Sequence, residues 1–491
     1  PRVRRQRQMC IRDSMLNDIF NILLPQMCLG GFIILQLIFS LIFSPRLYRY
    51  ARLVSIIGIS LSIILLTTVQ TEPQYFAFKD SLMSDSYTLL FDFMILVCGF
   101  LTALLTRGLV KTIKGNAYTF HAILLAGIFG AMNIVSANDF LTLFVSIEIL
   151  SFSTYFLIAA AKGYYSKEAS FKYLLTSAVS TGFFLFGVSY LYGICGSINL
   201  SEIYETVINQ DPSIMYAIAS IMIVLGLIAK LAVFPFANWV IDVYKGTESS
   251  VLAFLSTIPK LAVFGIVCRL FVFPLSNSFE LTFTIAVISL ITALWANTYA
   301  VRENNVKAIL ACSASANSSY VLLAASLVSV YNLSTVIFYL LCYVLMNISA
   351  FAFLNICGDK HDMDVNSFQG LFYKNHGLAG AYAFSILALA GIPITSGFVA
   401  KIYLFTAIAN SGLFFVPFLL ALLILTVVAL YYYLKIILPL FEKCDKNVEV
   451  SELNPVFSQK FVLIATAIAT LVIGIYPEKI IELCRFIAYN I

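Results

Sequence analysis

Apolar segments of about 20 residues follow one another along the whole chain, separated by short polar breaks. A helix of about 20 residues spans the hydrocarbon core of a bilayer, which is about 30 Å thick. The pattern therefore predicts an all-α polytopic membrane protein with about 14 transmembrane helices. The expected spans are 16–44, 51–70, 86–107, 117–137, 139–161, 170–194, 214–240, 249–273, 279–301, 306–328, 331–357, 377–409, 412–438 and 458–476.

Two of the expected spans contain a proline near a lysine. The seventh holds Lys230 five residues before Pro235, and the twelfth holds Lys401 after an interruption at Gly391-Ile-Pro393. Proline removes a backbone donor and clashes with the preceding turn, so both helices are expected to be broken. Because these two spans run in opposite directions, they follow the pattern of inverted-repeat transporters.

This pattern suggests a division of the chain into four parts. Residues 116–275 would form one repeat, helices 4 to 8, and residues 276–440 a second, inverted repeat, helices 9 to 13. Residues 15–115 would add three N-terminal helices, and residues 441–491 a last helix and a tail. The first 14 residues, PRVRRQRQMCIRDS, contain five arginines and no apolar run. They fit a basic targeting segment or an extraneous extension equally well, and we exclude them from the fold.

The composition supports a membrane protein and excludes several other classes. Of the 491 residues, 61% are hydrophobic and 11% are charged, whereas a soluble protein carries about 25% charged residues. The ten cysteines are scattered without a C-x-x-C pair, and only three histidines are present, so we expect neither a zinc site nor a disulfide framework. The net charge of +5 does not indicate a nucleic-acid partner, because the basic residues lie in loops beside the membrane.

The charges of the loops predict the orientation. By the positive-inside rule, the odd-numbered connections face the cytoplasm or the mitochondrial matrix, because they carry the basic residues. Both termini then lie on the opposite, periplasmic or intermembrane side. The basic residues of the odd-numbered connections are Arg46, Arg49, Arg52, Arg107, Lys111, Lys114, Lys162, Lys167, Lys172, Arg302, Lys307, Lys443 and Lys446.

Four ionisable side chains, Glu148, Lys230, Lys260 and Lys401, lie well inside apolar segments. A charge at bilayer depth costs roughly 2.5–3.5 kcal/mol on insertion scales, so such residues indicate function. Pairing Glu148 with Lys230 has the lowest cost and leaves the other two lysines without an obvious carboxylate partner. Since burial favours an uncharged amine, both are candidates for proton exchange. We interpret the four as a proton relay, in which opening or closing the Glu148–Lys230 pair changes the proton affinity of Lys260.

Each of these residues also has a structural interpretation. A lysine near a helix end can extend its stem so that the ammonium reaches water, and Glu148 could be a static, hydrogen-bonded acid in the core. A purely structural role for all four is the weaker interpretation, because their number and placement are unusual together. Asp92, Arg269 and Lys435 lie closer to the ends of spans and are expected to be interface residues.

Several motifs resemble the antiporter-like subunits of respiratory complex I, and most closely the chain-2 members of NADH–ubiquinone oxidoreductase. The DVYKG motif and a lysine in place of glutamate at Lys401 favour chain 2 over chains 4 and 5. The resemblance covers about residues 15 to 480. The motifs are SANDFLTLFVSIEILSFSTYFL, EASFKYLLTSAVSTGFFLFGVSYLYGICGS, LIAKLAVFPFANWVIDVYKGTESSVLAFLSTIPKLAVFG, VRENNVKAILACSASANSSYVLLA, DMDVNSFQGL and LALAGIPITSGFVAKIYLF.

The resemblance implies 14 spans, two inverted five-helix repeats and broken seventh and twelfth helices. It also implies a Glu–Lys pair, a central lysine and a terminal lysine at the four positions chosen above, with Trp239 and Asn317 in supporting places. The chain would bind no redox cofactor itself, while other subunits hold FMN, iron–sulfur clusters and ubiquinone. Its partners would be other membrane-arm subunits, the antiporter-like chain 4 and the small chain 4L, together with membrane lipids.

The sequence departs from the family pattern at four positions. Ala237 stands in place of a histidine in the seventh helix, and Ile241 in place of the proline after Trp239. Ala308 replaces a basic residue, and Asn317 replaces a histidine on the central axis. Asparagine can hold a water wire but does not titrate near pH 7 as histidine does. The departures therefore affect mainly the proton route between Lys260 and Lys401.

We hypothesise a proton-translocating membrane-arm subunit of complex I, a subunit of an H⁺-translocating NADH:ubiquinone reductase with no redox chemistry in this chain. Protons would enter from the matrix or cytoplasmic side and leave through the second half near Lys401. Two alternatives stay open: a stand-alone or Mrp-type cation/proton antiporter subunit, and a non-pumping scaffold. The abundance of Ile, Phe and Tyr favours the mitochondrial inner membrane, with a bacterial plasma membrane as the alternative.

Overall fold

The computed structural model describes residues 23–43, 48–69, 75–106, 116–161, 163–209, 214–272, 275, 279–358, 363–443, 453 and 455–490. Within these residues, 12 helices are long and apolar enough to span a membrane. The prediction of an all-α polytopic fold is therefore confirmed. The basic first 14 residues, Arg46, Arg107, Lys111, Lys114, Lys162 and Lys446 lie outside the described residues.

Every expected span contains a helix in the structure. In chain order these helices are α2 (Leu24–Ile42), α3 (Tyr48–Leu66), α4 (Ser86–Leu105), α5 (Ala117–Ser136), α6 (Phe140–Ala159), α7 (Tyr164–Cys195), α9 (Ile214–Ile228), α11 (Ser249–Leu255), α12 (Ile258–Val272), α13 (Phe279–Arg302), α14 (Val306–Ser326), α15 (Val330–Cys357), α17 (His376–Ala390), α18 (Ser396–Asn410), α19 (Val416–Phe441) and α20 (Phe457–Ile475).

Further short elements lie between or after the spans. An antiparallel hairpin of β1 (Tyr75–Ala77) and β2 (Leu82–Ser84) pairs Tyr75 with Ser84, Phe76 with Met83 and Ala77 with Leu82. Hydropathy does not reveal these elements, because they are too short or too polar to resemble a span. The others are α8 (Leu200–Ile208), η3 (Ala229–Leu231), α10 (Trp239–Gly246), η4 (Val365–Phe368), α16 (Leu371–Lys374), η5 (Leu413–Phe415) and α21 (Glu478–Tyr489).

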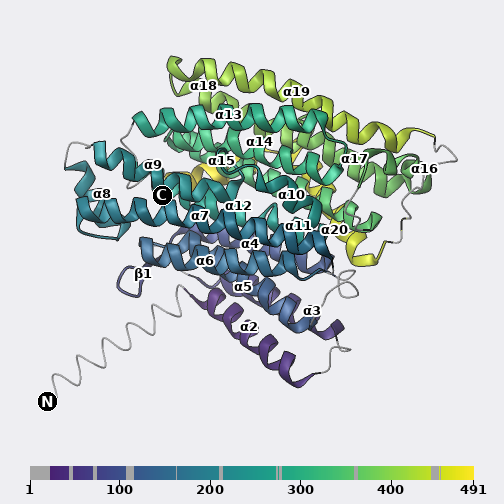
Figure 1. Ribbon diagram of the computed structural model, residues 1–491, viewed down its shortest axis with the longest axis horizontal. Coiled ribbons are helices and arrows are strands. Elements are labelled where there is room, and N and C mark those ends of the chain that lie inside the picture. Colours follow the sequence, from purple (N-terminus) through teal and green to yellow (C-terminus); the bar gives the residue numbers. More distant parts are fainter. Residues whose placement is uncertain are drawn as a thin grey trace.

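The helices lie side by side in an order that largely follows the sequence (Figure 1). The N-terminal helices α2 and α3 form one edge of the bundle, and α18 and α19 form the opposite edge (Figure 1). The central helices α12 and α14 are buried along their whole length. Helix α14 carries hydroxyl and amide side chains on most of its turns, and such a polar helix is stable inside a membrane only where other helices separate it from lipid.

The expected breaks in the seventh and twelfth spans are confirmed. In the seventh, α9 gives way to η3, and a new helix, α10, begins only at Trp239. In the twelfth, α17 ends at Ala390 and α18 begins at Ser396. The eighth span, expected as one helix, is also interrupted, because α11 ends at Leu255 and α12 begins at Ile258. The proline after Ile258 does not kink this helix from within, since it occupies the first turn, where no backbone donor is needed.

The expectation that Asp92 and Arg269 lie at an interface is wrong. Both side chains are buried, and Arg269 is only 1% exposed. The Arg269 Nη2 atom lies 2.8 Å from Oδ2 of Asp85, the residue that caps the N-terminus of α4. An arginine inside an apolar bundle requires such a carboxylate partner, since an unpaired buried charge is costly.

Candidate functional site

Lys230 lies in η3, where the seventh span is broken. Its Nζ donates hydrogen bonds to Oγ of Ser151, at 2.8 Å, and to Oγ of Ser177. The Trp239 indole Nε1 donates to the carbonyl of Ala229 at 3.2 Å, which satisfies one acceptor at the break. Irregular backbone at this depth is stable only where protein groups or water take up its hydrogen bonds. The Phe234–Pro235 peptide bond beyond η3 is cis.

Glu148, on α6, does not form the expected direct ion pair with Lys230. Its Oε1 accepts a hydrogen bond of 2.7 Å from Oγ1 of Thr181 on α7. Ser151 lies one turn along α6 from Glu148, and Ser177 one turn along α7 from Thr181, so hydroxyl groups lie between the carboxylate and the ammonium. The packing of α6, α7 and η3 leaves the carboxylate and the ammonium without a direct contact, and each bonds to hydroxyl groups instead.

Glu148 also lies closer to the surface of the chain than the sequence predicted. It is half-buried, and it lines an open, mostly apolar groove of about 560 Å³ formed by α5 and α6. Phe144, Ile149 and Phe152 line the same groove. A carboxylate in an apolar groove of a membrane helix is expected to be covered by protein in an assembly, because exposure to lipid would be costly.

Lys260 is the most enclosed of the three lysines, and it extends from α12 toward α14 and α15. Its side chain is 4% exposed. The Nζ atom donates to the carbonyl of Ala314 at 2.5 Å, to Oγ of Ser318 at 2.7 Å and to the hydroxyl of Tyr343 at 3.1 Å. These three acceptors are neutral, so no carboxylate of the described residues contacts this amine. Lysine is suited to such a site because it can exist in either protonation state.

A chain of polar side chains passes from the surroundings of Lys260 through Asn317. The ring of Tyr339 stacks on that of Tyr343, with centroids 6.5 Å apart, and its hydroxyl donates to Oδ1 of Asn317 at 2.9 Å. Asn317 Nδ2 donates in turn to Oγ of Ser313 at 3.4 Å. The Ser313 hydroxyl lies 2.5 Å from that of Tyr433 on α19. Asn317 therefore keeps the polar connection that a histidine would make, without a titratable group.

Lys401, on α18, caps the other broken helix. Its Nζ donates to the carbonyls of Leu389 and Ala390 at 2.8 and 2.9 Å. These are the last residues of α17, whose carbonyl end attracts a positive charge. The structure thus brings Lys401 to the break that contains Pro393. Gly391 ends α17 with φ +85°, and a Cβ there would lie 2.9 Å from Cδ of Lys401, so only glycine fits without strain.

The hydroxyl groups around the lysines were not found from the sequence. Ser151 and Ser177 contact Lys230, Thr181 contacts Glu148, and Ser318 contacts Lys260. A usable signal existed for two of them, since Ser177 and Thr181 are four residues apart on one face of α7. Serine and threonine are common in membrane helices, however, so spacing alone does not distinguish these positions. Within the described part of the chain, no three His, Cys, Asp or Glu side chains gather as metal ligands.

A group of charges connects α10 to the start of α14 at one end of the bundle. Lys245 Nζ lies 2.9 Å from Oε2 of Glu303, and Lys307 Nζ donates to the carbonyl of Thr247 at 2.9 Å. Lys435, on α19, donates to the carbonyl of Glu303 at 2.7 Å, where α13 has just ended. The second half of the broken seventh span is therefore fixed to helices of the second expected repeat.

We expect the Lys245–Glu303 contact to depend on pH. Partial burial raises the pKa of Glu303, but hydrogen bonds from Lys245 and the Asn305 and Asn304 backbone outweigh it and hold the pKa below its ordinary value. A carboxyl group with a lowered folded-state pKa contributes stability above its unfolded value, about pH 4.3. That stability is lost as pH falls through the lower folded value. Glu303→Gln should lower the melting temperature at pH 7 by a few degrees, and the difference from wild type should disappear in acid.

The control for this prediction is Glu280→Gln, which removes an exposed carboxylate near the start of α13. It should leave the melting temperature unchanged, because an exposed charge contributes little. Equal melting temperatures for Glu303→Gln and wild type at pH 7 would contradict a stabilising contact.

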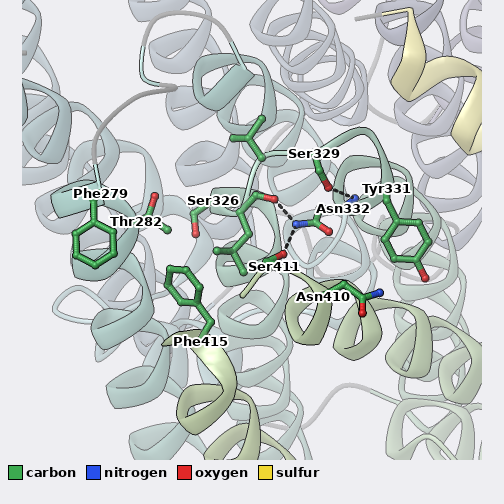
Figure 2. A pocket seen from close by; sticks show the side chains of 11 residues that line it. Phe279, Thr282, Ser326, Ser329, Tyr331, Asn332, Asn410, Ser411 and Phe415 are labelled. Carbon is green, nitrogen blue, oxygen red and sulfur yellow. Dashed lines mark hydrogen bonds between the residues drawn. The ribbon is translucent and has the colours of Figure 1, made fainter. Parts of the chain in front are cut away.

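A polar pocket of about 640 Å³ opens at the opposite end of the bundle, where α14 leads into α15 and α18 leads into η5. Figure 2 shows Asn332 at its centre, donating through Nδ2 to Oγ of Ser411 at 2.9 Å and to the carbonyl of Leu327. The Asn332 backbone N–H also donates to Oγ of Ser329 at 3.0 Å. The complete lining is Phe279, Thr282, Ser326, Leu327, Val328, Ser329, Tyr331, Asn332, Asn410, Ser411 and Phe415.

A known protein family and several proteins of known name are similar to this chain. Residues 137–428 match the family described as NADH:quinone oxidoreductase/Mrp antiporter, TM. The chain belongs to this family. It is 32% identical over 488 residues to NADH-quinone oxidoreductase subunit N of Anoxybacillus flavithermus, covering 95% of this chain and 96% of the relative. It is also 31% identical to the chloroplastic NAD(P)H-quinone oxidoreductase subunit 2 of Chlorokybus atmophyticus, covering 84% and 82% of the two chains.

Solved structures support the same fold. A chain of respiratory complex I from Thermus thermophilus superposes with a TM-score of 0.80 at 25% identity, over 93% of this chain and 98% of the other. A chain of the Mrp complex from Dietzia sp. gives a TM-score of 0.82 at 18% identity, over 97% of each chain. At that identity the second likeness shows a shared fold only.

Proposed function

We propose that this chain is a proton-translocating membrane subunit of an NADH–quinone oxidoreductase, equivalent to subunit N or chain 2. Redox chemistry elsewhere in the complex would drive proton movement through this chain. The observation that carries the proposal is the series Glu148, Lys230, Lys260 and Lys401, which lies inside a chain that matches subunit N over nearly its whole length. We call these four the relay residues.

The contacts of the relay residues suggest how each would act. Glu148 and Lys230 each bond to hydroxyl groups on neighbouring turns of α6 and α7, and a hydroxyl can accept one proton and donate another. Charge at the Glu148–Lys230 end would alter the field on Lys260, whose neutral partners leave it free to gain or lose a proton. Lys401 would receive the proton at the second break, where the carbonyls of α17 favour its charged form. The two breaks would belong to inverted repeats at residues 116–275 and 276–440.

The exit would lie in the second half of the chain. Helix α18 carries Lys401 and ends at Asn410, which lines the polar pocket of Figure 2. Pro393 and Trp239 would act by shaping the two breaks, and Asn317 by ordering the polar chain between the central and terminal lysines. Water in the pocket would complete the route, because its hydroxyl and amide lining can hold an ordered water chain.

The proposal includes partners and location. Other membrane-arm subunits equivalent to chains 4 and 4L would flank this one, and the Glu148 groove is a suitable surface for such a contact. FMN, iron–sulfur clusters and ubiquinone would be bound by other subunits. Bacterial relatives favour a plasma membrane, and the mitochondrial inner membrane is the alternative. Both termini would lie on the periplasmic or intermembrane side, by the charge of the loops.

Purification of the native assembly tests the proposal against an independent antiporter. Subunits carrying flavin and iron–sulfur clusters should co-migrate with this chain. In that assembly, Glu148→Gln should lower proton uptake per NADH oxidised by about tenfold, since a positioned proton-transfer group contributes at least that much. Asp242→Asn, at an exposed carboxylate, is the matched control and should pump normally. Full proton uptake by an assembled Glu148→Gln complex would favour a scaffold instead.

A further inference from the structure

A buried carboxyl group outside the relay lies between the N-terminal helices. Asp92, on α4, is 2% exposed, and Gln26, in the first turn of α2, is 4% exposed. Gln26 Nε2 donates to Oδ2 of Asp92 at 3.1 Å. Within the described part of the chain, the other oxygen of each side chain, Oδ1 of Asp92 and Oε1 of Gln26, is buried without a hydrogen-bond partner. Two such unsatisfied acceptors on a bonded pair are unusual, because buried polar atoms are nearly always paired.

The nearby charges do not neutralise an Asp92 carboxylate. Asp85, two turns back along α4, has the same sign. Arg269 on α12 binds both oxygens of Asp85 through Nη2, and within the described residues its Nε and Nη1 bond neither to Asp92 nor to any other group. Lys260, also on α12, donates to groups on α14 and α15. On the other elements packed against α4, Arg52 and His121 lie near the starts of α3 and α5, at the far end of α4. Helix α11 has no charged residue. The remaining titratable groups on the elements packed against α4 are Tyr50, Tyr118, Cys268, Tyr331, Tyr339, Cys342, Tyr343, Cys357, Lys460, Glu478, Lys479, Glu482, Cys484, Arg485 and Tyr489.

A proton satisfies this site better than a metal ion or an unpaired charge. An ionised carboxylate with one neutral donor in an apolar bundle would cost several kcal/mol. A hard cation needs about six oxygen ligands, whereas Asp92 and Gln26 offer two uncommitted oxygens among the described residues. Protonation of Asp92 at Oδ1 turns this oxygen into a hydrogen-bond donor. Of the two unsatisfied acceptors, Oδ1 then donates, and Oε1 of Gln26 can accept from it.

We propose that Asp92 is a proton-binding site, in which the neutral carboxylic acid is paired with the amide of Gln26. The site lies outside both expected repeats and outside the relay residues. It is two turns into the bundle from Asp85, about 10 Å along α4 at 1.5 Å per residue. Helix α2 lies at the edge of the bundle opposite α18 and α19, and α4 lies further inside the bundle (Figure 1).

The first turn of α2 gives the site a means of releasing its proton. Leu23 provides no side-chain cap for this helix, so backbone N–H groups at its start remain unsatisfied by the helix itself. The positive end of the helix dipole would stabilise a transient Asp92 carboxylate. Asp92 is therefore neutral at rest and able to ionise, which is the requirement for a group that exchanges protons.

Infrared spectroscopy of the assembled complex in membranes tests the proposal. Asp92→Asn should remove one carbonyl stretching band of a protonated carboxylic acid from the wild-type spectrum. Gln26→Leu should retain this band and shift it to higher frequency, because the acid loses its hydrogen bond. Asp242→Asn, at an exposed and ion-paired carboxylate, should leave the region unchanged.

An Asp92→Asn spectrum with all protonated-carboxyl bands intact would overturn the proposal. If that variant does not assemble, Gln26→Leu decides the question, since an unshifted spectrum would overturn it equally. The infrared measurement detects the protonation of Asp92 and does not depend on proton transport. A complex that pumps no protons would refute the proposed function and still leave the Asp92 band to be seen.

Discussion

Lys260→Met in the assembled complex is expected to lower the number of protons translocated per NADH oxidised by about tenfold. Methionine has a similar length and no titratable group, so the variant removes the amine while filling its space. Replacing a buried charge with an apolar side chain of similar volume is often neutral for stability. The complex should therefore assemble normally, and the loss should appear in proton translocation, measured with a pH-sensitive dye in sealed vesicles.

The matched control is Lys172→Met, the same chemical change at an exposed lysine that pairs with Glu168 and Asp242. It should retain the wild-type proton stoichiometry. Ser318→Ala should have an intermediate effect, because Lys260 keeps its contacts with Ala314 and Tyr343. An unchanged stoichiometry in an assembled Lys260→Met complex would refute the relay role of this lysine.

Gly397→Val is expected to prevent assembly of the subunit. Gly397 lies in the first turn of α18, and a Cβ at this position would be 1.9 Å from the carbonyl oxygen of Ala388. Backbone atoms cannot move aside as a flexible side chain can, so α17 and α18 would have to separate. We expect a cost above about 4 kcal/mol, the range of the most damaging single substitutions. The amount of subunit in the intact complex, measured by native electrophoresis, should fall close to zero.

Gly380→Ala is the control for this second prediction. Gly380 lies in α17, and a Cβ there would meet no atom within 4 Å. Alanine favours a helix over glycine by up to about 1 kcal/mol, so this variant should assemble as well as wild type or better. Normal assembly of Gly397→Val would contradict the close approach of α17 and α18, and with it the placement of Lys401 on the α17 carbonyls.

The relay residues show which features of the site follow from the local sequence and which depend on how the helices pack. Lys230 and Lys401 were found beside expected helix breaks because charge, proline and hydropathy are local properties of the chain. The pairing of Glu148 with Lys230 stays a prediction, and the structure shows no direct ion contact between them, because the distance between two side chains depends on how α6, α7 and η3 pack. The sequence contained the intervening hydroxyls, but only packing decides which faces of two helices meet.

Hydropathy also does not predict the burial of the charged residues near the ends of the spans. Asp92 lies six residues from the start of its expected span and Arg269 four residues from the end of its own, yet both side chains lie inside the bundle. Their surroundings come from segments far away in the chain: Asp85 is 184 residues from Arg269, and Gln26 is 66 residues from Asp92. A window of about 20 residues contains no information about such partners.

Hydropathy, proline and charge along the sequence were enough to predict the membrane class, the long apolar helices, the breaks of the seventh and twelfth spans, and four ionisable side chains inside apolar segments. Hydropathy, proline chemistry and the cost of a buried charge act within one helix, so they can be read from one segment. Only the folded arrangement of the helices shows the hydroxyl partners of Glu148 and Lys230, the neutral partners of Lys260, the contact of Lys401 with the α17 carbonyls and the burial of Asp92. These features depend on which helix faces meet, and that is settled by packing among segments distant in the chain.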